Sequence, residues 1–169
     1  MNPLRTYAYV GPASVRIASA PQPPGTPITS REALRAWLAA SPEARRDAAT
    51  FIIDPEGALR LAPRRSEHVA CAGGGDVLAA GEIAFTPDAS SVRWCSNQSS
   101  GYCPEPASFA ALARALGAMG VAAPEGYDLA CEWRRCAACG QINLVKDAVL
   151  TCGACDAALP EVWNFAQEP

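Results

Sequence analysis

Two Cys-x-x-Cys units near the end of the chain constrain its folding more than any other feature. Cys136 and Cys139 form the first unit, Cys152 and Cys155 form the second, and twelve residues lie between them. Two cysteines at this spacing can reach one metal ion from a single tight turn, and two such turns complete a tetrahedral shell of four sulfurs, which suits zinc. The sequence therefore predicts one zinc ion bound by these four thiolates.

This segment resembles the zinc-ribbon family over about residues 131–160. Gly140 and Gly153 supply conformational freedom at the two turns, and the apolar stretches 142–145 and 148–150 are predicted to be strands. The resemblance implies two cysteine knuckles joined by a β-hairpin. It also implies a structural metal, because four protein ligands leave no position for an activated water. The alternative is a set of redox-active or unrelated thiols, although a redox pair normally occurs once and on a βαβ unit.

Charge in this segment does not favour nucleic acid as a partner. Residues 131–169 contain three basic side chains (Arg134, Arg135 and Lys146) and five acidic ones, which sum to −2 before any metal is bound. The whole chain has a formal charge of −3 and a pI near 5.2. Phosphate binding usually needs a basic stripe. We expect the three basic residues to offset the negative charge of a four-thiolate zinc centre, and Trp163 to close the small core of the ribbon or to anchor a partner.

The remaining sequence predicts an α+β body over residues 1–126, followed by a ribbon and tail over 127–169. Alternating or apolar stretches bounded by turn residues predict an antiparallel β-meander. Two or three helices are expected, one of them capped by Thr29 with Glu32 three residues later. The predicted strands are 4–10, 49–53, 59–61, 67–71, 77–85 and 91–95, and the predicted helices begin at 29, at 42 and after 106.

His68 is the only histidine, so imidazole chemistry would have to occur there. If residues 67–71 and 77–85 formed a hairpin with Cys71 opposite Val77, His68 and Glu82 would lie on the same face and could act in acid–base catalysis. Cys103 is a possible nucleophile beside them. The alternative for His68 is a hydrogen-bonded residue of the sheet.

Several polar residues are candidates for binding a small ligand. Arg65 precedes His68, and the loop around residues 96–103 is rich in donors and acceptors. A loop of this kind can also satisfy its own backbone without any ligand. The candidates in this loop are Asn97, Gln98, Ser99 and Tyr102.

These observations favour a non-enzymatic module that binds a partner protein or a small polar ligand. One alternative is a small hydrolase or transferase that uses His68, Glu82 and the loop 97–103, and a further alternative is a nucleic-acid binder. No run of about 18 apolar residues is present, so no transmembrane helix is expected. A secretory signal is not expected either. The default expectation is a cytoplasmic protein, and the composition is bacterial-like.

Overall fold

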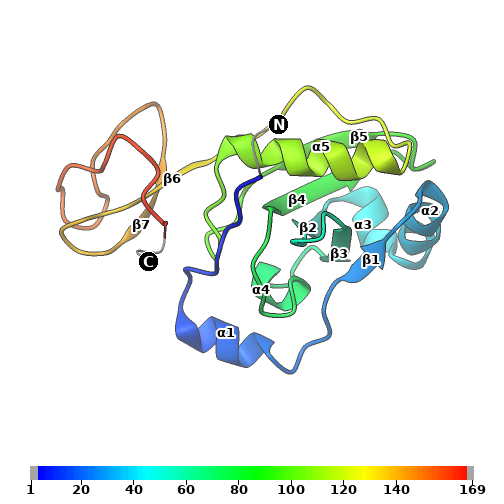
Figure 1. Cartoon of the computed structure of the whole chain (residues 1–169), viewed down its shortest axis with the longest axis horizontal. Helices are drawn as coiled ribbons and strands as arrows, with labels where there is room; N and C mark the ends of the chain where they lie inside the picture. Colours follow the sequence, from blue (N-terminus) through cyan, green and yellow to red (C-terminus); the bar gives the residue numbers. More distant parts are fainter. Residues whose placement is uncertain (1–3, 167–169) are drawn as a thin grey trace.

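A computed structural model describes residues 4–166 of the protein and has the predicted α+β class (Figure 1). Its main sheet is antiparallel, with five strands in the order β1-β3-β2-β4-β5. Because β4 pairs with β2 and not with β3, the strand order departs from a simple meander. The strands are Thr26–Ile28 (β1), Ala49–Ile53 (β2), Leu59–Pro63 (β3), Ala79–Phe85 (β4) and Val92–Ser96 (β5).

The β2–β3 hairpin follows from local turn chemistry, as predicted. Asp54 Oδ1 accepts a hydrogen bond from the backbone N–H of Ala58 at 2.8 Å, and its other oxygen binds Arg60 Nε at 3.0 Å. Gly57 adopts a φ of 87°, which glycine reaches without steric cost. This turn fixes the register in which Phe51 lies opposite Leu61.

Within residues 4–166 the structure contains five α-helices, of which three were predicted. The helix expected at residue 29 begins one residue late, because Ser30, and not Thr29, accepts the capping hydrogen bond from Ala33 N at 3.0 Å. The helix expected after residue 106 ends near Gly120, whose φ is 68°. The helices are Ala13–Ser19 (α1), Arg31–Ala40 (α2), Pro42–Arg46 (α3), His68–Cys71 (α4) and Phe109–Ala118 (α5).

The hairpin predicted from residues 67–71 and 77–85 is wrong. Residues 68–71 form helix α4, and β4 lies in the middle of the sheet between β2 and β5. Non-local pairing decides this outcome, since β4 exchanges hydrogen bonds with two strands that are distant from the Gly73–Gly75 turn. Ala79 lies opposite Ile53, so the register that was to join His68 and Glu82 does not form.

The N-terminal part also differs from the prediction. The strand expected at 4–10 is reduced to one bridge between Tyr7 and Val77. Residues 26–28 form β1, although Pro27 lies among them. Pro27 is tolerated there because β1 is an edge strand, and a proline without an N–H group loses no hydrogen bond on the free side.

Two apolar cores lie on opposite faces of the sheet. Helices α2 and α5 cover one face, where Leu34 and Leu112 pack with Phe51. Helix α4 covers the other face, where Ile52 packs with Val69 and Tyr102. Figure 1 shows α5 lying along one side of the sheet and the C-terminal segment projecting beyond it.

The C-terminal segment contains a second sheet of two antiparallel strands, Glu132–Arg135 (β6) and Ile142–Val145 (β7). It joins the body through a small cluster of Cys103, Cys131, Trp133 and Phe165. Among the helices of residues 4–166, none has the length and apolar character needed to cross a bilayer.

Candidate metal centre and charged cleft

The four cysteines of the two Cys-x-x-Cys units come together, as predicted. Their Sγ atoms all lie within 4.8 Å of one another. Two of the separations are 3.6 Å, between Cys136 and Cys155 and between Cys139 and Cys152. Sulfurs at about 2.3 Å from a tetrahedral zinc ion would be about 3.8 Å apart, so the cluster has the size that one metal ion requires.

Each knuckle is a tight turn closed by backbone hydrogen bonds. Gly140 N donates to Cys136 O at 2.9 Å, and Asp156 N donates to Cys152 O at 3.0 Å. The residue after each second cysteine takes a positive φ, 76° at Gly140 and 59° at Asp156. The prediction that Gly153 provides this freedom in the second turn is therefore wrong, and Asp156 does so, because aspartate tolerates the left-handed region better than most residues.

The strands around the knuckles also differ from expectation. Residues 142–145 form β7, as predicted, but its partner is β6 and not residues 148–150. The first knuckle thus connects the two strands. A single bridge between Thr151 and Ala158 flanks the second knuckle instead.

Asn143 links the two knuckles and was not identified from the sequence. Its Nδ2 donates to the sulfur of Cys152 at 3.6 Å, and its Oδ1 accepts from Gly153 N at 3.0 Å. Ala154 N also donates to the Cys152 sulfur at 3.4 Å. The backbone N–H of Ala154, followed by that of Cys155 and by the Asn143 side chain, lowers the pKa of the Cys152 thiol to about 6, which favours the thiolate that binds metal. The sequence signal that could have identified this role is the presence of one polar residue inside the apolar stretch 142–145.

The basic residues near the cluster have mainly structural contacts. Arg134 is 8% exposed and donates to the backbone carbonyls of Pro160 and Glu161 at 3.1 and 2.9 Å. The Arg135 guanidinium lies 5.3 Å from the centre of the Phe165 ring. Both arginines therefore hold the C-terminal tail against β6.

Trp163 lies at the junction of ribbon and body. Its Nε1 donates to the backbone carbonyl of Cys103 at 2.7 Å, and its ring packs edge-on against Tyr7. Trp163 thus belongs to the contact between the two parts of the chain and not only to the core of the ribbon.

Within residues 4–166, no hydrogen bond or ion pair joins the side chains of His68, Glu82 and Cys103 to one another. His68 begins α4, and its Nε2 lies 2.9 Å from the carbonyl oxygen of Gly81. Because a carbonyl only accepts, Nε2 carries a proton. Burial lowers the pKa of His68, so the ring is neutral at pH 7. Cys103 is fully buried, and burial raises the pKa of its thiol to about 12.

The polar loop residues are mostly structural as well. Asn97 is fully buried, and its amide binds the backbone of Pro104 and Cys131. Tyr102 donates from its hydroxyl to Gly75 O at 2.6 Å. Ser99 is buried, and its hydroxyl has no hydrogen-bond partner within residues 4–166. Gln98 is exposed.

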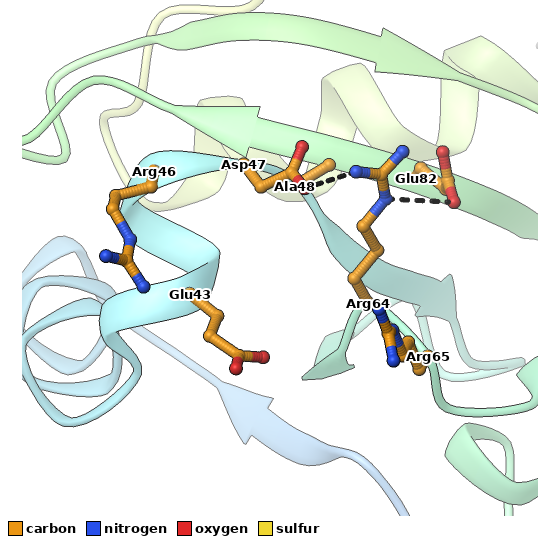
Figure 2. Close-up of a pocket in the computed structure, with 7 residues that line it drawn as sticks. All are labelled: Glu43, Arg46, Asp47, Ala48, Arg64, Arg65 and Glu82. Carbon is orange, nitrogen blue, oxygen red and sulfur yellow. Dashed lines mark hydrogen bonds and ion pairs between the residues drawn. The ribbon is translucent and has the colours of Figure 1, made fainter.

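Glu82 and Arg65 instead line a charged cleft of about 750 Å³, seen in Figure 2. The cleft lies where α3 leads into β2 and where β3 ends. Sequence patterns identified two of its residues and missed the others, because the cleft assembles from three separate segments. The remaining charged residues of the lining are Glu43, Arg46, Asp47 and Arg64.

Comparison of the chain with protein-family models, with curated proteins and with solved structures finds no match.

Proposed function

We propose that this protein is a non-enzymatic binding module whose C-terminal segment is held in shape by one structural zinc ion. The observation that carries the proposal is the cluster of four cysteine sulfurs, all within 4.8 Å of one another. An all-thiolate set of four is typical of zinc in a closed site. Cys131 is buried directly before β6 and does not belong to the cluster.

The chemistry of the other candidate residues supports binding over catalysis. Four protein ligands would leave zinc no open position for substrate or water. The Cys103 thiol is buried and protonated at neutral pH, which opposes a nucleophilic role. One nitrogen of His68 is already engaged by Gly81. We infer that the body binds a partner protein or a small polar ligand, and that the metal stabilises the segment docked beside it.

Metal content tests the zinc part of this proposal. The purified chain is expected to contain one zinc ion, and Cys139→Ser is expected to lose it, since three thiolates hold zinc more weakly and the exposed side of the site is opened. Cys95→Ala provides the matched control, because Cys95 is a buried thiol of the main core, outside the cluster. That variant should retain one zinc ion. Equal zinc content in both variants would overturn the proposal.

A further inference from the structure

The charged cleft gathers side chains from three segments of the body, residues 43–48, residues 64–65 and Glu82. Figure 2 shows α3 on one side, the end of β3 on the other and β4 behind them. Acidic and basic groups alternate around it. Three carboxylates and three guanidiniums line the cleft, and they belong to Glu43, Asp47, Glu82, Arg46, Arg64 and Arg65.

Three of these six groups interact with one another, and together they keep one negative charge. The Arg64 guanidinium pairs directly with Asp47, and its Nε lies 3.8 Å from Glu82 Oε1. The hydrogen bond that Arg64 donates to Asp47, together with the charges of both carboxylates, raises the pKa of Arg64 above its usual value. Arg64 thus spans the back of the cleft and has no charge to spare for a ligand.

The other three groups have no such partners. Within residues 4–166, the side chains of Arg46, Arg65 and Glu43 make no hydrogen bond or ion pair. All three are exposed to solvent. The cleft therefore offers two guanidiniums and one carboxylate without a protein partner, while the charges of its whole lining sum to zero.

The backbone that presents these side chains is fixed on both sides. The Thr50 hydroxyl is buried and lies 3.1 and 3.2 Å from the carbonyl oxygens of Arg64 and Ser66. Across the cleft, Arg93 donates to the carbonyls of Arg46 and Asp47 at 3.3 and 3.1 Å. The backbone of the cleft is therefore preformed, and binding of a ligand has to order only the side chains.

The charge pattern restricts the chemistry of a ligand. A polyanion such as nucleic acid would meet three carboxylates, and a simple cation would meet three guanidiniums. A ligand with two anionic groups and one cationic group complements the unpaired side chains. Guanidinium groups bind carboxylates well, through paired hydrogen bonds, and a carboxylate binds an ammonium group.

We propose that the cleft binds an acidic α-amino acid, or a dipeptide with an acidic first residue and a free C-terminus, with the two carboxylates at Arg46 and Arg65 and the ammonium at Glu43. The cleft volume lies within the range of small-molecule sites, about 300–1,000 Å³. This inference rests on the binding role proposed above but does not depend on the metal. The two sources of the ligand share one chemistry, and the titrations below distinguish them.

Calorimetric titration of the full, zinc-loaded chain tests the proposal. The probes are L-glutamate and the dipeptide L-glutamyl-L-alanine, each with two carboxylates and one ammonium. Glutarate lacks the ammonium, and 4-aminobutyrate lacks one carboxylate. Saturable binding of either amino-acid probe is expected, and the tighter of the two identifies the source. Glutarate and 4-aminobutyrate should each bind about tenfold more weakly, as loss of one charged hydrogen bond implies.

Variants assign the binding to the cleft. Arg65→Gln and Glu43→Gln should each weaken binding of the better probe by about tenfold. Arg45→Gln is the matched control, because Arg45 is exposed on the same helix as Arg46 but does not line the cleft. Zinc content, measured on the same samples, should remain one per chain in all three variants.

Three results would overturn the proposal: no saturable binding of either amino-acid probe, glutarate binding as tightly as glutamate, or equal weakening by Arg45→Gln and Arg65→Gln. If any of these results is found while zinc is still bound, the proposal about the metal centre remains intact. Loss of zinc from the wild-type chain with intact probe binding would contradict the metal proposal alone.

Discussion

The buried side chain of Asn97 binds both backbone polar groups of Cys131, 34 residues further along the chain. Its Oδ1 accepts from Cys131 N at 2.6 Å, and its Nδ2 donates to Cys131 O at 2.9 Å. Asn97 follows the end of β5, and Cys131 directly precedes β6. This pair therefore connects the main sheet to the strand that leads into the metal cluster.

Asn97→Ala should destabilise the protein by about 3 kcal/mol, because it leaves the buried N–H and C=O of Cys131 without partners. Urea unfolding measures the change. Gln98→Ala is the control, since Gln98 is exposed, and it should change the free energy of unfolding by less than about 0.5 kcal/mol. Similar effects of the two substitutions would show that the Asn97 contact contributes little.

Removal of zinc by a chelator should unfold the C-terminal segment and leave the five-stranded sheet folded. The cluster around Cys136 and Cys152 has few apolar neighbours and depends on the metal. The core around Phe51 and Leu112 does not involve the cluster. Amide hydrogen exchange should show lost protection in β6 and β7 and retained protection in β2. Simultaneous loss in β2 would mean that the two parts unfold as one unit.

His68 should make the protein less stable as the pH falls below about 6.5. Burial lowers its pKa in the folded state, so below 6.5 the unfolded chain takes up a proton that the folded ring resists. The contribution of neutral His68 to the free energy of unfolding is fully present above pH 6.5. As the pH falls below 6.5, this contribution decreases by at most about 1.4 kcal/mol per pH unit.

Urea unfolding of the wild type and His68→Gln at pH 7.5 and 5.5 measures this contribution. Glutamine keeps a donor for the Gly81 carbonyl but does not titrate. The wild type should lose more stability than the variant between the two pH values. Equal losses would show that His68 is not the group responsible.

Gly81 should not tolerate a side chain. A Cβ at this position would lie 1.9 Å from the backbone oxygen of Ser96, in the central part of the sheet. Gly81→Ala is expected to cost more than about 3 kcal/mol. Gly117→Ala is a matched comparison, because a Cβ there meets no atom within 4 Å and lies inside helix α5. That substitution should stabilise by up to about 1 kcal/mol. Thermal unfolding distinguishes the two outcomes.

Features set by a few adjacent residues could be predicted from the sequence. The β2–β3 hairpin follows from the Asp54 to Gly57 turn, and the metal cluster follows from cysteine spacing. The start of α3 at Pro42 also agrees with the prediction. In each case the residues that decide the structure are close in sequence.

Features set by distant partners could not be predicted. Residues 68–71 are too few for apolar periodicity to distinguish a helix from a strand. The position of β4 depends on its pairing with β2, which lies about 30 residues away along the chain. Asn97 was identified as polar and unusual, but its partner Cys131 could only be found in the folded structure. The charged cleft likewise combines residues from α3, β4 and the end of β3.

X-ray absorption at the zinc edge, together with the zinc content of the purified chain, tests the central claim most directly. We expect one zinc ion per chain with four sulfur neighbours at about 2.3 Å and no oxygen neighbour. A chain without bound metal, disulfides among Cys136, Cys139, Cys152 and Cys155, or a zinc shell that includes water would contradict a closed structural centre.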